Sequence, residues 1–161
     1  MDLDTIRLDA VYTWVDNTDP IWFEKYQKAS KNKHLPHYNR YGDFGELEFS
    51  IACLRKYASF IDRIFLVTDN QIPPNLDLDK YGVIIVDHES ILGEECCYPT
   101  FKSNSIESYL YRIKDLSTNF LYFNDDTCLG DYVNKSDFFT ASGKPIVDLF
   151  NKKINFVEPP K

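Results

Sequence analysis

The sequence is short of positive charge. Its 18 Lys and Arg residues are outnumbered by 25 Asp and Glu residues, which gives a formal net charge of -7. No run of lysine or arginine stands out. Nucleic acids and anionic membrane surfaces are bound through clustered positive charge, so we expect the protein to bind neither.

Long apolar runs are also missing. No stretch reaches the roughly 18 consecutive apolar residues that predict a membrane-spanning helix. The N-terminal sequence MDLDTIRLD has no basic segment followed by an apolar one, so it does not predict a signal peptide. We therefore expect a soluble chain without a membrane segment, and the cysteine pattern described next leads us to expect a cytoplasmic one.

Cysteines are few and lack the spacing of a metal site. The four are Cys53, Cys96, Cys97 and Cys128, with one vicinal pair and no C-x-x-C motif. This pattern suits neither a disulfide framework nor a zinc site. We expect reduced thiols.

What is present is enough for one folded domain over residues 1–161. Hydrophobic residues make up 43% and aromatic residues 16% of the 161-residue chain. A chain of this length buries a sizeable core, and its composition excludes intrinsic disorder. We find no internal repeat.

Four short apolar segments have the composition of β-strands, and each ends in polar residues. The segment at 120–123 looks buried and stops at Asn124, Asp125 and Asp126. The other segments cover residues 9–15, 63–68 and 83–86, followed respectively by DNTDP, DNQIPP and DHE. Ligands of open α/β sheets bind outside the carboxyl ends of the strands, so we expect these polar tips to share one sheet edge and line a crevice.

The acidic pair Asp125 and Asp126 allows two interpretations. Adjacent carboxylates repel each other unless a cation lies beside them, which favours a hard divalent metal, Mg2+ or Mn2+, that holds a phosphate. An N-D-D tripeptide also forms an ordinary turn after a strand. The residues alone leave both interpretations open.

Two segments have helical periodicity. One follows the D-x-x-E capping box formed by Asp43 and Glu46, and ends near residues 57–60. Its apolar residues Leu47, Ile51, Leu54 and Ala58 fall on one face. The other is predicted over residues 106–113, with Ile106, Leu110 and Ile113 on one stripe and capping-box spacing between Asn104 and Glu107.

The histidines give no clear metal signal. His34 and His37 lie in a Lys-rich segment at 22–40, which we interpret as an exposed helix face or loop with surface histidines. His88 stands between two acids, so we expect a partly exposed, salt-bridged side chain in preference to a catalytic base.

The order strand, helix, strand, strand, helix, strand predicts a mainly parallel, three-layer α/β sheet. Residues 9–15 lack a polar interruption, which is typical of a central strand covered on both faces. Residues 131–161 lose periodicity and are predicted to be an irregular tail.

Four motifs together resemble the Stealth family, which includes bacterial capsular sugar-phosphate transferases and the catalytic subunit of N-acetylglucosamine-1-phosphotransferase. DAVYTWVDNTDP at 9–20 resembles the family's first conserved region. Three further segments within 45–130 resemble the family's second conserved region: GELEFSIACLRKYASFIDRIFLVTDNQIPPNL, IIVDHESIL and YPTFKSNSIESYLYRIKDLSTNFLYFNDDTCLG. The resemblance implies a Rossmann-like fold similar to the nucleotide-sugar core of A-type glycosyltransferases.

The resemblance also implies a reaction and its partners. The reaction is transfer of a hexose-1-phosphate from a nucleotide-diphosphate sugar donor to a hydroxyl of a glycan acceptor. Asp125 and Asp126 match the family's acidic pair, which makes them the expected catalytic residues and metal ligands. The implied substrate-binding residues are Asp16, Asn17, Asp19, Gln71, Asn104 and Glu107.

Two departures from the family pattern bear on activity. Glu48 and Ala52 stand where the family commonly has arginines, and no third or fourth conserved region follows residue 130. We expect either a fragment or a reduced homologue. Two other functions stay open: an ordinary glycosyltransferase, in which the acceptor attacks the anomeric carbon, and an inactive nucleotide-sugar-binding module.

Overall fold

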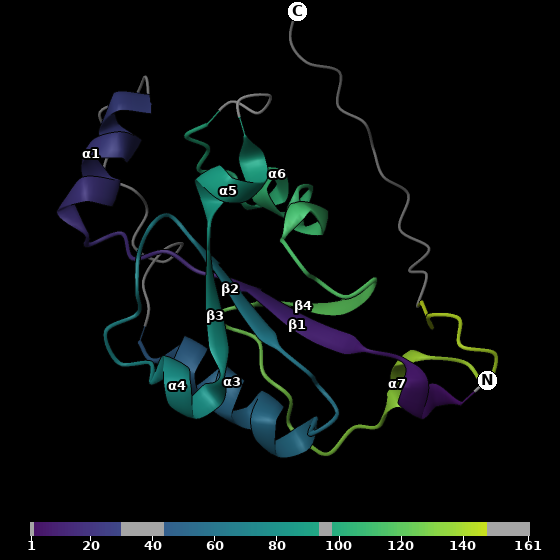
Figure 1. Cartoon of the computed structure of the whole chain (residues 1–161). Helices are drawn as coiled ribbons and strands as arrows, with labels where there is room; N and C mark the ends of the chain where they lie inside the picture. The colour runs from purple at the N-terminus through teal and green to yellow at the C-terminus, as the bar shows by residue number, and fades with distance from the viewer. Residues whose placement is uncertain (1, 30–43, 94–97, 148–161) are drawn as a thin grey trace, which may run out of the picture.

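The computed structural model describes residues 2–29, 44–93 and 98–147 (Figure 1). The predictions made for His34, His37, Asp43, Cys96, Cys97 and residues 148–161 fall outside these residues. Within them, no helix is both long and apolar enough to cross a membrane.

A parallel sheet forms the centre of the described residues. Its four strands are β1 (Leu8–Thr13), β2 (Ile64–Thr68), β3 (Val83–Asp87) and β4 (Asn119–Asn124). They lie in the order β3-β2-β1-β4, and every neighbouring pair is parallel. The predicted parallel α/β sheet is confirmed, with β1 in the interior because it pairs on both sides.

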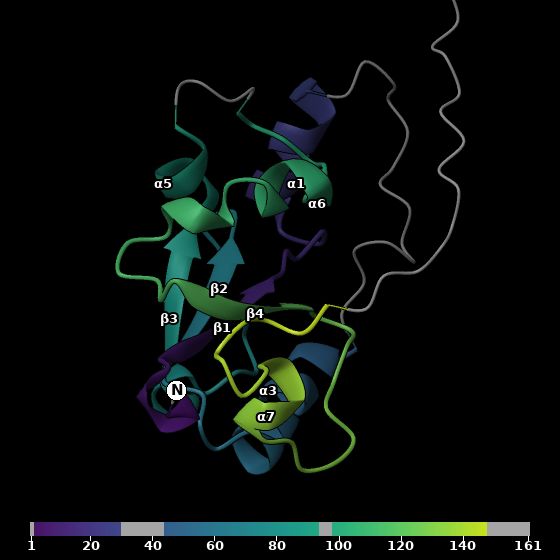
Figure 2. The ribbon, with the colours of Figure 1, turned by 90° about the vertical axis from the view of Figure 1, so that its right-hand side faces the viewer.

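Side chains alternate across this sheet and build two separate cores. Leu8, Ala10 and Tyr12 of β1 point into one core, and Val11 points into the other. Helices α3 (Glu46–Tyr57), α4 (Leu78–Tyr81) and α7 (Lys135–Phe138) cover the first face. The second face is covered by α5 (His88–Leu92), α6 (Ser103–Glu107) and the 3-10 helix η2 (Leu110–Arg112) (Figure 2). The structure therefore has the predicted three layers.

Helix α3 packs with the expected face. Leu47, Ile51, Leu54 and Ala58 are all buried. The N-cap of the helix is Gly45, which forms no side-chain cap hydrogen bond, and Asp43 of the predicted capping box lies outside the described residues. The φ angle of Gly45 is 95°, a left-handed conformation that glycine adopts without strain.

The helix predicted over 106–113 is wrong as one continuous element. It is divided into α6 and η2, so Ile106 is buried from α6, Leu110 from η2, and Ile113 from the position directly after η2. The capping box at Asn104 is also wrong. Lys102 is the N-cap of α6, and the Asn104 carbonyl accepts hydrogen bonds from the Ser108 amide and hydroxyl.

Strand β4 is less buried than predicted. It pairs only with β1 in the described sheet, and its residues 119–123 are half-buried. The region after residue 130, where periodicity is lost, contains α7 and places Phe139 in the first core. The amide of Val133 donates to the Tyr57 carbonyl over 3.1 Å, which joins this region to the end of α3.

A buried ion pair holds the amino ends of the strands together. Asp9 is fully buried, and its two carboxylate oxygens accept from Arg63 Nε at 3.2 Å and Nη2 at 2.9 Å. The amide of Ser117 donates to the same carboxylate over 2.8 Å. Because Ser117 precedes β4, this cluster joins β1, β2 and the approach to β4 at the edge opposite to the polar strand ends.

Candidate functional site

The carboxyl ends of all four strands lie at one edge of the sheet, as predicted. Register pairs Thr13 of β1 with Asn124 of β4 and with Val67 of β2, and pairs Thr68 of β2 with Asp87 of β3. Parallel strands in this register bring the segments after Thr13, Thr68, Asp87 and Asn124 side by side. This edge is where ligands bind in open α/β sheets.

The first cavity at this edge has a volume of about 240 Å³. It is lined by residues that follow three of the strands and by α1 (Pro20–Ala29) and α6: Thr13, Trp14, Val15, Trp22, His88, Thr100, Phe101, Ser103, Ile106, Asn124, Asp125 and Asp126. It therefore holds both predicted catalytic carboxylates.

The acidic pair sits in a turn that projects it to the cavity. The Thr127 amide and hydroxyl both donate to the Asn124 carbonyl, at 3.2 and 2.8 Å, which leaves Asp125 and Asp126 as the two central residues. The turn is therefore real, and it also presents the two carboxylates to the first cavity. The turn and metal interpretations are compatible.

Helix α3 anchors this turn through a buried hydroxyl. Ser50 Oγ donates to the Thr127 carbonyl, and it lies 2.9 Å from the Tyr12 hydroxyl. Since serine has one hydroxyl hydrogen, Tyr12 is the donor in the second contact. Burial raises the pKa of Tyr12 to about 12, so this donor keeps its proton at neutral pH.

A second hydroxyl chain lies beneath the cavity. The hydroxyls of Thr13 and Tyr122 are 2.9 Å apart, and Tyr122 donates to Asn124 Oδ1 over 2.9 Å. Burial raises the pKa of Tyr122, and the carboxylates of Glu107 and Asp125 act in the same direction. Glu107 therefore lies close to this chain, although it does not line the first cavity. Sequence reasoning missed Tyr122, which shares the alternating face of β4 with Asn124.

Aromatic rings form one wall of the first cavity. Trp14 and Trp22 are 4% and 2% exposed. Trp22 stacks on Tyr26 with ring centroids 5.4 Å apart and meets Phe101 edge to face at 5.3 Å. These stacked and edge-to-face contacts hold Trp22 in a fixed orientation beside the cavity. The sequence signal was available, because both tryptophans of the chain flank the first acidic motif.

A second cavity of about 260 Å³ lies beside the first and shares Trp14 as a wall. Two predicted substrate-binding residues, Asp16 and Asn17, line it together with Glu48. Asp16 Oδ1 accepts from the Thr18 amide at 2.8 Å and hydroxyl at 2.6 Å, which fixes the turn after β1. The predicted residues thus divide between two adjoining cavities.

Gln71 holds the loop after β1 in place. Its buried side-chain amide donates to the Asp16 carbonyl at 2.9 Å and to Asp19 Oδ2 at 3.2 Å. Its side-chain oxygen accepts from the Asp16 amide at 3.0 Å. Gln71 lines neither of the two cavities; it joins the ends of β1 and β2 behind them.

Asp19 orients α1 from the same network. Its Oδ1 accepts from the amides of Ile21 at 2.7 Å and Trp22 at 3.3 Å, at the amino end of the helix. Burial raises the pKa of Asp19, but the hydrogen bonds from Gln71 and from those two amides outweigh it, so the pKa lies below its ordinary value. The ionised carboxylate therefore positions Trp22 at the first cavity.

Replacing Gln71 by leucine should lower the free energy of unfolding by about 1–3 kcal/mol, because it leaves the Asp16 amide and carbonyl without their buried partner. Urea unfolding measures this change. The control is Gln27→Leu, which makes the same replacement at an exposed position of α1 and should change stability by about 0.5 kcal/mol or less. Equal effects of the two substitutions would contradict the role given to Gln71.

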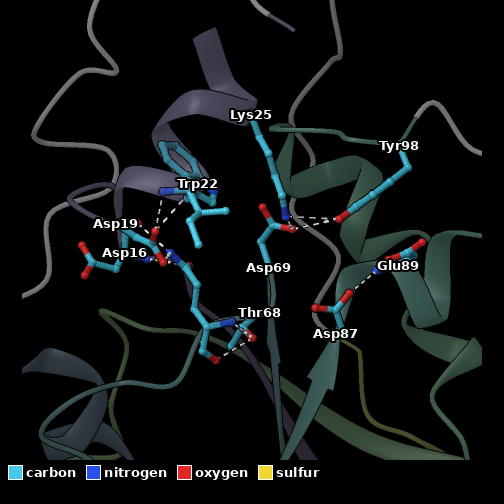
Figure 3. A network of polar contacts seen from close by, with 11 residues as sticks. Asp16, Asp19, Trp22, Lys25, Thr68, Asp69, Asp87, Glu89 and Tyr98 are labelled. Atoms are coloured by element: carbon cyan, nitrogen blue, oxygen red, sulfur yellow. Dashed lines mark hydrogen bonds and ion pairs between the residues drawn. The ribbon is translucent and has the colours of Figure 1, made fainter. Parts of the chain in front are cut away.

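Asp69, the polar tip of β2, is buried in an ion pair. Lys25 Nζ of α1 lies 3.0 Å from Asp69 Oδ1, and the Tyr98 hydroxyl donates to the same oxygen over 3.1 Å (Figure 3). Burial lowers the pKa of Lys25, but Asp69 outweighs this effect, and the pKa of Lys25 lies above its ordinary value. The pair therefore stays charged and ties α1 to the sheet edge.

The polar start of α6 contributes other residues than those predicted. Ser103 and Ile106 line the first cavity, whereas Asn104 is exposed and is not among the lining residues. Asn104 and Glu107 flank the cavity from the helix that supplies its rim.

His88 is buried, so the expected salt-bridged surface histidine is wrong. It is 3% exposed, because α5 begins at His88 directly after β3 and no loop carries the side chain outward. Burial lowers the pKa of His88 and outweighs the opposing effects of the Asp69 and Asp87 carboxylates. The imidazole is therefore neutral at pH 7 and lines the first cavity.

The carboxylates of the site could coordinate a metal ion only if a bound ligand supplied further oxygen atoms. Among the described residues, no group of three or more His, Cys, Asp or Glu side chains is placed to hold a metal. Mg2+ is commonly bound by one or two carboxylates plus phosphate oxygens and water. Asp125 and Asp126 meet that lower requirement.

These features define a class: a parallel α/β protein with ligand cavities at the carboxyl edge of its sheet. Residues 7–34 match conserved region 1 of the Stealth proteins, and residues 40–147 match conserved region 2. The chain belongs to the Stealth family. The second match extends past residue 130 and includes α7.

Relatives carry names from polysaccharide synthesis. A capsular polysaccharide phosphotransferase of Actinobacillus pleuropneumoniae is 35% identical over 159 residues, which cover 94% of this chain and 43% of the relative. An exopolysaccharide phosphotransferase of Streptomyces coelicolor is 39% identical over 145 residues, covering 86% of this chain and 15% of the relative. The chain spans less than half the length of these relatives.

Proposed function

We propose that this chain carries the donor site of a sugar-phosphate transferase that acts in capsular or surface polysaccharide synthesis. The observation that supports this most is the first cavity, where Asp125 and Asp126 lie with Trp14 and Trp22 at the carboxyl edge of a parallel sheet. The names of the relatives support the same class of reaction.

In the proposed reaction, a hydroxyl oxygen of the glycan acceptor attacks the phosphorus that bears the hexose. The bond from that phosphorus to the bridging oxygen of the diphosphate breaks, and the nucleoside monophosphate leaves with the electron pair. The hydroxyl proton passes to a carboxylate base. Asp126, the more exposed member of the pair, is the proposed base, and Asp125 faces the diphosphate.

The tryptophans and the turn at 124–127 position the donor. Trp14 and Trp22 form an apolar wall of the cavity, and the anchored turn holds the two carboxylates at a fixed place beside that wall. A Mg2+ or Mn2+ ion held by Asp125 and Asp126 would supply Lewis-acid stabilisation of the diphosphate charge. We propose the cytoplasm as the location, because Cys53 and Cys128 are free thiols and thiols stay reduced there.

Product analysis tests this function. The protein is incubated with uridine, cytidine and guanosine diphosphate sugars and with oligosaccharide acceptors, and the released nucleotide is identified. Release of the nucleoside monophosphate is expected. Release of the diphosphate would indicate an ordinary glycosyltransferase, and donor binding without any release would indicate a binding module.

Donor affinity should depend on a divalent cation. Removal of Mg2+ and Mn2+ by a chelator is expected to weaken nucleotide-sugar binding roughly tenfold or more, because Glu48 and Ala52 supply no positive charge for the diphosphate. Calorimetric titration measures the change. The matched control is the nucleoside without phosphate, whose affinity should not respond to the chelator. Equal donor affinity with and without chelator would remove the metal from the proposal.

A further inference from the structure

His88 carries a buried polar atom for which the described part of the chain supplies no partner. Its Nε2 is shielded from solvent and has no hydrogen-bond partner among the described residues. Leaving such an atom unpaired costs about 1–3 kcal/mol. Because His88 also lines the first cavity, a ligand bound there is the partner that a rotation of the imidazole would bring within reach of Nε2.

The place of His88 in the cavity separates it from the acidic pair. His88 follows β3 and the carboxylates follow β4, and these are the two outer strands of the described sheet. Three strand spacings separate them, which is roughly 14 Å. A ligand that reaches both ends of the cavity therefore presents different groups to His88 and to Asp125.

The surroundings of His88 select the kind of group it contacts. Asp69 and Asp87 act on it with negative charge, and Lys25, a positive neighbour, is already paired with Asp69. This field disfavours a phosphate. A neutral imidazole has one donor and one acceptor nitrogen, which suits a hydroxyl group.

We propose that His88 is a substrate-binding residue whose Nε2 forms a hydrogen bond to a hydroxyl of the bound nucleotide sugar, at the end of the first cavity opposite to Asp125 and Asp126. The inference rests on the proposed function and adds a contact that fixes the orientation of the donor. The hydroxyl belongs either to the ribose or to the hexose.

The test compares His88→Leu and His88→Gln with the wild type. Calorimetry with Mg2+ measures affinity for a panel of uridine, cytidine and guanosine diphosphate sugars and for the same diphosphates without sugar. His88→Leu should bind the donor roughly 5- to 100-fold more weakly, because it lacks the hydrogen bond. His88→Gln should recover part of the affinity, since its amide both donates and accepts. The control Glu89→Gln, at an exposed neighbour, should bind like the wild type.

Thermal unfolding without ligand gives the independent readout. His88→Leu should be at least as stable as the wild type, because an unpaired polar atom is replaced by an apolar group. The calorimetric affinities locate the contact. If His88→Leu weakens binding of the diphosphate sugar only, the contact is to the hexose; if it weakens binding of the free diphosphate as well, the contact is to the ribose.

Three results would overturn the proposal. Wild-type donor affinity in His88→Leu would show that Nε2 binds no ligand. Loss of stability together with affinity, without recovery in His88→Gln, would show a packing role. A wild type that binds none of the panel would refute the proposed function itself, and that outcome is distinct from unchanged binding in the variant.

Discussion

Replacement of Asp126 by asparagine is expected to lower turnover by roughly two orders of magnitude or more and to leave the fold intact. The substitution removes the charge and the proton-accepting capacity at nearly constant shape. The turn at 124–127 does not require the carboxylate, because its hydrogen bonds run from Thr127 to the Asn124 carbonyl. Asparagine also occupies turn positions readily. The expected signature is therefore lost function with unchanged unfolding.

Nucleotide release and thermal unfolding are measured on the same preparations. Asp131→Asn is the control, since it makes the same change at an exposed residue outside both cavities. The comparison is repeated on cation-dependent donor affinity, which reports on the metal contact without turnover. Wild-type values for release, affinity and unfolding in Asp126→Asn would remove Asp126 from the site.

Replacement of Asp9 by alanine is expected to lower the free energy of unfolding by about 3 kcal/mol or more. Asp9 is fully buried, and its loss leaves the guanidinium of Arg63 and the amide of Ser117 without their acceptor. Breaking a buried pair from one side costs about 3–5 kcal/mol, and the 27% exposure of the Arg63 side chain favours the lower end. Urea unfolding at pH 7 measures the loss. Asp4→Ala, at an exposed carboxylate, should have little effect.

The Asp9 contribution should disappear in acid. Burial raises the pKa of Asp9, but the hydrogen bonds from Arg63 and Ser117 and the charge of Arg63 outweigh it, so the pKa lies below its ordinary value. A lowered carboxyl pKa stabilises the fold fully above the unfolded-state pKa of about 3.9, and the stabilisation is lost as the pH falls through the folded-state pKa. The gap between wild type and Asp9→Ala should therefore be constant from pH 5 to 7 and narrow below about pH 4. A gap that stays constant into acid would contradict the ion-pair account.

The helix predictions show how far local patterns reach. The spacing of Leu47, Ile51 and Leu54 correctly predicted the buried face of α3, because helical periodicity is a property of neighbouring residues. The same periodicity at Ile106 and Ile113 predicted burial correctly but not continuity. The break between α6 and η2 is compatible with the apolar spacing, since Ile106 of α6 and Leu110 of η2 both still pack against the sheet.

For the site residues, too, the sequence predicted the position but not the individual contacts. The acidic tips of the strands were visible in the sequence, and parallel order alone was enough to bring them to one edge. Their individual roles were not visible. Asp16 lines a cavity, while Asp19 and Asp69 are held in hydrogen bonds and an ion pair behind it. Acidic residues after a strand have the same local sequence signal whether they meet a ligand or a helix.

The sequence by itself determined the four strand segments, the buried face of α3, the parallel orientation of the strands and the edge where the site lies, because these follow from residue spacing and from strand polarity. Only the tertiary structure decided that β4 is half-buried, that Gln71 joins two loops and that His88 lines the cavity with a nitrogen that no described residue pairs. The physical reason is that burial and hydrogen-bond pairing depend on atoms far away in the chain. Asp16 and Gln71 are separated by 55 residues and meet at 3.0 Å only once β1 and β2 lie side by side.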